Sequence, residues 1–527
     1  MNNQQQFLLL KENTEQIRGK DALKSNIEVI KILAETIRTT IGPKGLNKML
    51  VDSLGDLTIT NDGAKILEEL SIDNPTAKMI VDLAKTIHKN VGDGASSVVL
   101  FIGALMEKVE EMLSMNLPPA IIYDGFLKAI KYVKNELDHL SIAVSPEQES
   151  IIKKALVQTA LNSKSLMDSR DLFVDIIIKA VDKITEYRES NPYIDLDNIQ
   201  IIKRSGRSLH STQFIDGIII DKEVVSPILP KNIENAKIAL LNGALEVVKT
   251  DFSSEIQINA PDEIQRFLEE EEHIIKNLVD SIVATGANVV FCQKGIDETA
   301  QHFLAQHGIL AVRRVKNSDM QKLAKATGAT IINRVKDLSS DDLGDAGKVI
   351  ERKIGGENMV FIENCRNPKA ITILVRGSTD TVVNDAERSL KNGLHALKTF
   401  IEHPKYVGGG GSIEIELRKR LLKYAEKVGG KQQISIENFA NALEIIPNVL
   451  IENSGNDPLD ILTSLRSQVD YDQNKWYGFD AVTRTIVDVQ EHGILEVMDT
   501  KWHIYNLATE LAVIFIRIDD YIRAKGK

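Results

Sequence analysis

The sequence predicts a multidomain α+β protein whose two ends are mostly helical and whose middle alternates helices with strands. The chain has 527 residues, and a single hydrophobic core rarely grows beyond about 250–300 residues, so two or three domains are expected. Apolar runs rich in β-branched residues gather in the middle, whereas the flanks show apolar residues at helical spacing. Helical ends around an α/β middle indicate one domain built from both termini, with the middle inserted into it.

The first third of the chain is predicted to be largely helical. Between Leu23 and Ile37 an apolar residue recurs every three or four positions, which places these side chains on one face of a helix. The turn Gly42–Gly45 ends that helix. We then expect short β segments at Met49–Asp52 and Leu57–Thr60, helices near 64–70, 75–90 and 96–113, and another helix opened by Pro118-Pro119.

The middle contains several apolar runs that are predicted to be buried strands of an α/β layer. Between two of them lies Pro261–Ile282, which has an apolar stripe at helical spacing and four consecutive glutamates, Glu269–Glu272. We expect the glutamates to form a solvated helix face. After Gly408–Gly411 the sequence turns helical again and ends in a long helix from about Lys501 to Arg523. The predicted strands are Ile218–Ile220, Ile238–Leu241, Val289–Phe291 and Ile309–Val315.

Composition excludes several classes of protein. The net charge of −11 argues against a general nucleic-acid-binding protein, which normally has a basic excess. The two cysteines, Cys292 and Cys365, are too few for a disulfide framework and suit a reducing cytosol, although they could pair in a hyperthermophile. No run of about 18 apolar residues and no secretory signal is seen. We therefore expect a soluble, cytoplasmic protein.

The most informative motif runs from Val91 to Leu100. Two glycines flank Asp93, two serines follow, and an apolar helix then begins. Glycines let backbone amides approach phosphate oxygens, and a helix N-terminus supplies unpaired donors. The Asp93 carboxylate suits Mg²⁺, which prefers carboxylate and phosphate oxygens. On this stretch alone, an ordinary turn in which Ser96 caps the helix is an equally good interpretation.

Three further glycine turns lie at Gly42–Gly45, Thr60–Gly63 and Gly408–Gly411. Taken singly, they are explained as a helix stop, a β-turn and a hinge. The chain has no Gly-x-x-x-x-Gly-Lys-Ser/Thr sequence, so it is not a standard P-loop NTPase. It also lacks His-Glu-x-x-His and Cys-x-x-Cys, and nothing indicates a structural zinc.

Together these motifs resemble those of the group II chaperonins, the archaeal thermosome and eukaryotic cytosolic chaperonin family, and the archaeal branch more than the eukaryotic one. The resemblance extends from about Gln16 to Arg523 and does not depend on one motif. The family's nucleotide loops are matched by Thr40–Leu50, Thr60–Ala64, Val91–Gly94 and Gly409–Leu417. Its client-binding domain is matched by Ala284–Asp297 and Ala311–Val315.

The resemblance implies a subunit of a homo- or hetero-oligomeric double ring that binds unfolded client proteins and assists their folding inside a chamber, using ATP and Mg²⁺. Neither nucleic acid nor a membrane is an expected partner. In the family, the helical segment matching Pro261–Ile282 is a protrusion that serves as a built-in lid. Three domains are implied: a mostly helical equatorial ATP-binding domain at 1–143 and 402–527, an intermediate hinge domain at 144–213 and 366–401, and an α/β apical client-binding domain at 214–365.

The resemblance also implies roles for individual residues. Asp93 would hold Mg²⁺, and Asp62 and Gly63 would lie near the γ-phosphate and the attacking water. Lys164 would sense the γ-phosphate from the intermediate domain, although without the resemblance it would be taken for a solvated surface lysine. The other contacts would be Thr40, Ile41, Gly42 and Pro43 along the nucleotide, Gly94, Ala95, Ser96 and Ser97 around the phosphates, and Gly410, Asp480, Ala481 and Glu496 on the adenine and ribose side.

Three features depart from the family pattern. Family members usually have threonines at the positions of Ala95 and Ser96, and a proline at Val497; these changes are mild. The third departure is Asn392, which stands where the family has the aspartate that acts as general base or positions the water. An amide can orient a water but cannot take its proton, and losing a positioned base lowers the rate by roughly 10²–10⁴.

Two interpretations of the chain therefore stay open. It is an ATP-cycling subunit of a folding chamber, or it binds ATP, hydrolyses it poorly, and serves as a structural or regulatory member of a mixed ring. Asp62 could compensate for Asn392. Asp385 lies seven residues before Asn392, which is about 10 Å along a helix axis and too far to hold the same water. A nucleotide-dependent metabolic enzyme such as a kinase is a third class, but no small-molecule site is evident.

Overall fold

The computed structural model describes residues 14–51, 55, 57–70, 72–161, 168–189, 191–247, 261–365, 369–468 and 476–524. Helices and strands are both abundant, so the predicted mixed α+β class is confirmed. The chain forms two compact units, 1–174 with 388–527 and 175–387. The boundaries between them fall within two helices, α7 (Arg170–Ile184) and α11 (Asp380–Glu402).

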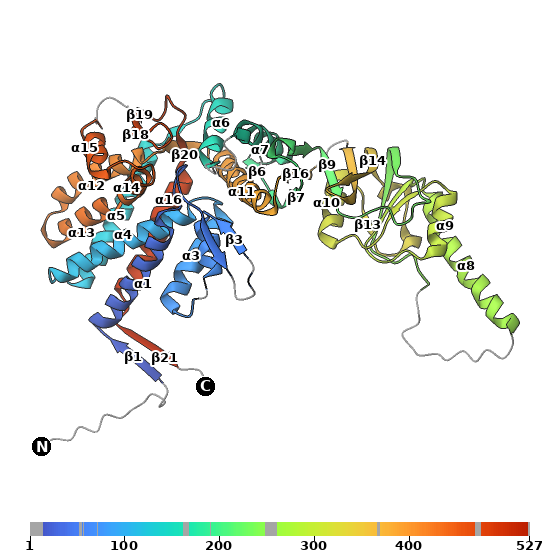
Figure 1. Ribbon diagram of the computed structural model, residues 1–527, viewed down its shortest axis with the longest axis horizontal. Helices are drawn as coiled ribbons and strands as arrows, with labels where there is room; N and C mark the ends of the chain where they lie inside the picture. Colours follow the sequence, from blue (N-terminus) through green and yellow to red (C-terminus); the bar gives the residue numbers. More distant parts are fainter. Residues whose placement is uncertain are drawn as a thin grey trace, which may run out of the picture. The chain divides into compact units, whose positions relative to one another are not determined.

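The first unit is organised around α4 (Ala95–Ser114), whose residues from Val98 to Met106 are all buried. A helix that is apolar on every side belongs in a core. In the core, Phe101 of α4 makes edge-to-face contacts with Phe439 and Tyr505, each with ring centroids 5.6 Å apart. Among the helices that pack against α4 (Figure 1) are α1 (Lys20–Arg38), α3 (Pro75–Asn90), α5 (Pro119–Leu140), α13 (Gly430–Ala442) and α16 (Met498–Ile516).

The first unit also contains further helices, two hairpins and a small sheet. The helices are α2 (Gly63–Glu69), α6 (Glu149–Ala160), α12 (Ser412–Val428), α14 (Ile445–Asn453) and α15 (Pro458–Gln468). Two antiparallel hairpins are formed by β2 (Lys48–Val51) with β3 (Leu57–Thr60), and by β18 (Tyr477–Asp480) with β19 (Thr485–Asp488). A three-stranded sheet has the order β20 (Leu495–Val497), β17 (Lys405–Gly408) and β4 (Ile142–Ala143).

The predicted long helix at the end of the chain is wrong in its last third. Helix α16 ends at Ile516, and the following strand β21 (Asp520–Ala524) pairs antiparallel with β1 (Thr14–Arg18) from the other end of the chain (Figure 1). Two aspartates, Asp519 and Asp520, follow Ile518. Acidic side chains are unfavourable at a helix C-terminus, and the segment gains a strand partner when the helix stops.

The second unit contains a seven-stranded mixed sheet in the order β12 (Leu310–Val312), β11 (Val289–Cys292), β10 (Asn232–Leu241), β14 (Gly344–Ile354), β15 (Glu357–Cys365) and β9 (Gly217–Ile220), with β13 (Ile331–Ile332) beside β10. Each of the four predicted strands is present. The helices α9 (Glu298–Gln306) and α10 (Asn317–Thr327) lie between strands in the sequence. A smaller sheet has β16 (Ile371–Gly377) between β7 (Ile199–Ser205) and β8 (Gln213–Ile215), and β5 (Glu186–Arg188) pairs with β6 (Asn191–Tyr193).

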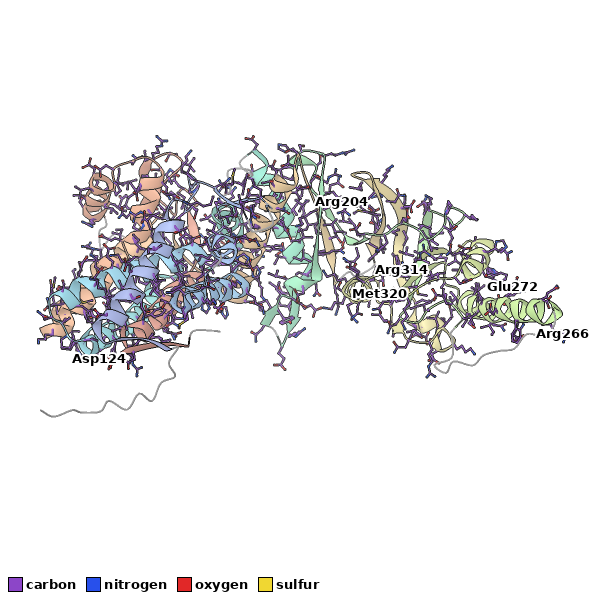
Figure 2. All side chains as sticks on the ribbon, turned by 60° about the horizontal axis from the view of Figure 1, so that its bottom comes forward. Asp124, Arg204, Arg266, Glu272, Arg314 and Met320 are labelled. Atoms are coloured by element: carbon purple, nitrogen blue, oxygen red, sulfur yellow. The ribbon has the colours of Figure 1, made fainter. Side chains whose placement is uncertain are left out.

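The N-terminal end of helix α8 (Pro261–Ala284) projects away from the sheet of the second unit (Figure 1). Its four glutamates are exposed, as predicted, and Arg266 and Glu272 both extend from it (Figure 2). The predicted apolar stripe is only partly buried, because Phe267 is 45% and Ile274 39% exposed, whereas Ile275 is 4% exposed.

Candidate functional site

The loop from Val91 to Gly94 joins α3 to α4 in a conformation that requires glycine. Gly92 and Gly94 have φ angles of 79° and 89°, in the left-handed region that favours glycine. The Asp93 carboxylate accepts a hydrogen bond from the Gly94 amide at 2.7 Å. Gly94 is also the N-cap of α4 and has no side chain to cap it. The first-turn amides of α4 are therefore available to a ligand.

Ser96 does not cap α4, so the alternative interpretation of this motif is wrong. Gly94, in the left-handed conformation, occupies the cap position. The Ser96 hydroxyl instead accepts a hydrogen bond from the Gly63 amide at 3.2 Å. Asp62 caps α2, because its carboxylate accepts from the Lys65 amide at 3.1 Å. The Thr60–Gly63 loop is thus in direct contact with the first turn of α4, which follows the Val91–Gly94 loop.

The electrostatics of this loop favour a cation. Burial raises the pKa of Asp93 above its usual range, and the nearby carboxylate of Asp62 raises it further, while the Gly94 amide and Lys501 oppose the shift. Such a carboxylate gains from an additional positive charge. One carboxylate completed by phosphate oxygens and water is a common way to hold Mg²⁺. Asp93 would thus supply one ligand of a magnesium ion, and phosphate oxygens and water would supply the others.

A buried charged network lies next to the same loop. The Lys501 ammonium, 3% exposed, contacts Glu414 at 2.7 Å and Glu496 at 2.8 Å, and the Tyr505 hydroxyl donates to the same Glu414 oxygen at 2.6 Å. Although burial alone would lower the pKa of Lys501, the two carboxylates raise it above its usual value. Burial also raises the pKa of Glu496, against the effect of Lys501. The ammonium is therefore held charged by two acids.

This network joins the fourth glycine loop to the Gly92–Gly94 loop. Glu496 packs closely on Gly409, because a Cβ atom added to this glycine would lie 3.0 Å from a Glu496 oxygen. Ile504 packs closely on Gly94, where an added Cβ would lie 2.7 Å from Ile504 Cδ1. Gly410, with φ of 61°, accepts from the Phe479 amide at 2.8 Å. Helix α12 starts at Ser412 with a glycine N-cap, as α4 does. Two helices with glycine N-caps thus begin beside one charged cluster.

The first loop is attached to the same unit through α14. Asn453 donates to the carbonyl oxygens of Arg38 and Ile41 at 3.0 and 2.9 Å. A Cβ on Gly42 would lie 2.6 Å from Leu450 Cδ2. The Thr40 hydroxyl donates to Ile37 at 2.6 Å, so it closes the end of α1. The Thr40 hydroxyl, the Thr40 amide and the Ile41 and Gly42 carbonyls are thus engaged within the protein, and these contacts fix the conformation of the loop.

Asn392, on α11, contacts the Gly92–Gly94 loop. Its side-chain nitrogen lies 2.8 Å from the Gly92 carbonyl oxygen and 3.3 Å from the Arg388 carbonyl oxygen. The reverse amide orientation would place oxygen against both oxygens, so the nitrogen is assigned to this side. One turn along α11, His395 packs on the same glycine, because a Cβ on Gly92 would lie 2.1 Å from His395 Cβ.

Comparisons with known proteins agree over almost the whole chain. Residues 33–526 match the TCP-1/cpn60 chaperonin family. Thermosome subunit beta of Sulfurisphaera tokodaii is 47% identical over 99% of this chain and 94% of its own length. Thermosome subunits of Pyrococcus horikoshii and Methanocaldococcus jannaschii are 47% and 46% identical, over 99% and 98% of this chain and 94% and 95% of their own lengths.

The chain belongs to the TCP-1/cpn60 chaperonin family. The resemblance to group II chaperonins is thereby confirmed, and this chaperonin subunit assists the folding of other proteins. The alternative, a subunit that binds ATP, hydrolyses it poorly and serves a structural or regulatory role in a mixed ring, is not favoured. In the part of the chain that the structure describes, no helix combines the length and apolarity needed to cross a bilayer.

The remaining predicted site residues of the chaperonin are placed as follows. Asp480 accepts from the Val482 amide at 2.8 Å and the Thr483 hydroxyl at 2.9 Å, so its carboxylate organises its own turn. Ala481 is buried, and Ser97 lies half-buried in the first turn of α4. Lys164 lies outside the described residues.

Sequence reasoning missed three residues of the charged network: Glu414, Lys501 and Tyr505. The signal was present for two of them. Lys501 and Tyr505 are four positions apart, so they share one side of α16. That side also carries Ile504 and Ala508, both buried. A lysine on the buried side of a helix is a sign of an internal ion pair.

Proposed function

We propose that this chaperonin subunit binds ATP with Mg²⁺ and uses its hydrolysis to fold client proteins inside a ring in the cytoplasm. The observation that carries the proposal is the convergence at Asp93. The Thr60–Gly63 loop reaches the start of α4 through the hydrogen bond between Gly63 and Ser96. The Gly408–Gly411 loop packs on Glu496, which pairs with Lys501 of α16, and Ile504 of the same helix packs on Gly94. Two glycine-capped helix N-termini supply unpaired amides there.

Within this proposal, each loop has a role in binding. Asp93 would hold Mg²⁺, and the first turn of α4, Ala95–Ser97 after Gly94, would donate to the phosphates. Asp62 and Gly63 would face the γ-phosphate and the attacking water. Thr40–Pro43 would lie along the nucleotide, and Gly410, Asp480, Ala481 and Glu496 on the adenine and ribose side. Lys164 keeps its proposed role as sensor.

The proposed domains are equatorial (1–143 and 402–527), intermediate (144–213 and 366–401) and apical (214–365). The inclusion of both chain ends in one compact unit supports the equatorial assignment. The exposed Phe267 and Ile274 on α8 support a client-facing or lid-forming protrusion, since they leave apolar surface open to another protein.

Ring assembly is supported by two open two-stranded sheets of the first unit. The β2–β3 hairpin exposes Met49 (64%), Val51 (64%) and Leu57 (56%). The β1–β21 pair is a separate two-stranded sheet, and such ribbons are marginal alone. Open edges pair readily with another chain. We propose that β2–β3 of one subunit joins β1–β21 of its neighbour in a homo- or hetero-oligomeric ring.

The experiment that tests the function is refolding of a denatured client by the purified, assembled protein, with steady-state ATP hydrolysis measured in the same samples. We expect recovery of the native client with Mg-ATP and little recovery without nucleotide. Equal recovery with and without nucleotide would reject ATP-driven folding. Removal of Mg²⁺ by a chelator should abolish both hydrolysis and nucleotide-dependent recovery.

A further inference from the structure

The surroundings of the Asn392 side chain require a hydrogen-bond donor. Two carbonyl oxygens, of Gly92 at 2.8 Å and of Arg388 at 3.3 Å, face its amide nitrogen. An amide nitrogen carries two hydrogens and can serve both oxygens, whereas an ionised carboxylate accepts only. An aspartate in the same rotamer would place oxygen against two carbonyl oxygens. Asparagine is therefore the residue that this conformation requires, so Asn392 does more than replace the general base of the family.

The Gly92 carbonyl is a sensitive point of the loop. Its oxygen and the amide of Asp93 belong to one planar peptide group, in which they point in opposite directions. Fixing the oxygen against α11 therefore fixes the direction of the Asp93 amide and the start of the Asp93 side chain. The neighbouring contact is tight as well, because a Cβ on Gly92 would lie 2.1 Å from His395 Cβ.

We propose that Asn392 is a positioning residue for the nucleotide loop: its amide holds Gly92 against α11 and so keeps Asp93 in the conformation that binds Mg-nucleotide. This inference rests on the proposed nucleotide binding and deepens it. It assigns to Asn392 a contribution to affinity that is independent of the rate of hydrolysis. If Asn392 were only a lost base, its replacement by alanine would leave nucleotide affinity unchanged.

The test compares three variants of the assembled protein with the wild type. Asn392→Ala removes the donor, and Asn392→Asp replaces it with an acceptor of nearly the same size. Asn384→Ala is the matched control, because Asn384 is an exposed amide on the same helix that accepts from Lys203 and makes no contact with the loop in the hydrogen bonds of the described residues. Binding of Mg-ADP is measured by calorimetry, since ADP avoids any effect of hydrolysis.

Hydrogen exchange of the peptide containing Val91–Ala95 is measured in parallel without nucleotide. We expect both Asn392 variants to bind Mg-ADP about three- to tenfold more weakly, which corresponds to one ordinary hydrogen bond, and to exchange faster in this peptide. The Asn384 variant should match the wild type in both measurements. Circular dichroism and particle size confirm that each variant is folded and assembled.

The outcomes separate the inference from the function on which it rests. Unchanged Mg-ADP affinity and unchanged exchange in Asn392→Ala would overturn the positioning role and leave nucleotide binding intact. A wild type that binds no nucleotide would overturn the proposed function. Should Asn392→Ala fail to assemble, the isosteric Asn392→Asp still decides: normal affinity and normal exchange in that variant would reject the inference.

Discussion

Two helices reach the Gly92–Gly94 loop at different residues, and they do so with different chemistry. Helix α16 packs Ile504 on Gly94 and carries Lys501, which is 3% exposed and paired with Glu414 and Glu496. Helix α11 packs His395 on Gly92 and carries the partly exposed Asn392. Helix α16 thus carries an internal ion network beside the loop, whereas α11 makes a single neutral hydrogen bond to it.

This difference indicates which side of the site tolerates amino-acid substitution. Removing one member of a buried ion network leaves an uncompensated charge, which is strongly destabilising. Replacing a partly exposed amide that makes one hydrogen bond to the loop lowers stability by about the net contribution of one hydrogen bond. The α16 side is therefore tied to folding of the whole unit, whereas the α11 side can alter the chemistry of the site without loss of the fold.

The largest effect is expected for Lys501→Met, which leaves Glu414 and Glu496 buried without their cation. We expect a loss of about 3–5 kcal/mol in the free energy of unfolding, measured by urea denaturation. The double variant Glu414→Gln with Lys501→Met should recover part of that loss. Lys427→Met, at an exposed position of α12, is the control and should change stability by less than about 0.5 kcal/mol. A single variant as stable as the wild type would contradict the view of this network as one unit.

The second prediction concerns Asp93→Ala, which removes the proposed Mg²⁺ ligand from the loop that both helices contact. We expect ATP hydrolysis to fall by at least about a hundredfold, within the range seen when electrostatic stabilisation of the reacting groups is lost. Stability should change little, since burial disfavours this charge. Asp124→Ala, an exposed site on α5 (Figure 2), is the matched control. Normal hydrolysis in Asp93→Ala would remove the metal from this loop.

The third prediction tests the α11 side. Asn392→Asp supplies a carboxylate that cannot remain against two carbonyl oxygens, so it must turn away from Gly92. We expect kcat for ATP hydrolysis at saturating ATP to rise at least about tenfold, the low end of what a general base contributes. Nucleotide affinity should fall in the same variant. If the wild type already turns over as fast as the variant, Asn392 does not limit hydrolysis.

Much of the fold could be predicted from local patterns, and the site less so. The strand at Val289–Cys292 and helices such as α4 follow from apolar runs and periodicity. The end of α16 was predicted wrongly, because β21 depends on a strand from the opposite end of the chain, Thr14–Arg18. The loop motifs pointed to Asp93, but the pairing of Lys501 with Glu414 is a tertiary contact that spacing does not encode. The family membership is confirmed, whereas the domain limits and the nucleotide contacts remain predictions.

The smallest effect concerns Ser96, which joins the second loop to the third and contacts neither α11 nor α16 through its hydroxyl in the hydrogen bonds of the described residues. Ser96→Ala removes the acceptor for the Gly63 amide, so we expect a loss of about 1 kcal/mol in the free energy of unfolding. Ser114→Ala, at the exposed end of α4, is the control. If the site behaves as separate contacts, Ser96→Ala combined with Asn392→Ala should lower stability by the sum of the single effects. A clearly larger combined loss would show that the loops and α11 form one cooperative unit, and that the contrast between the two helices is one of degree.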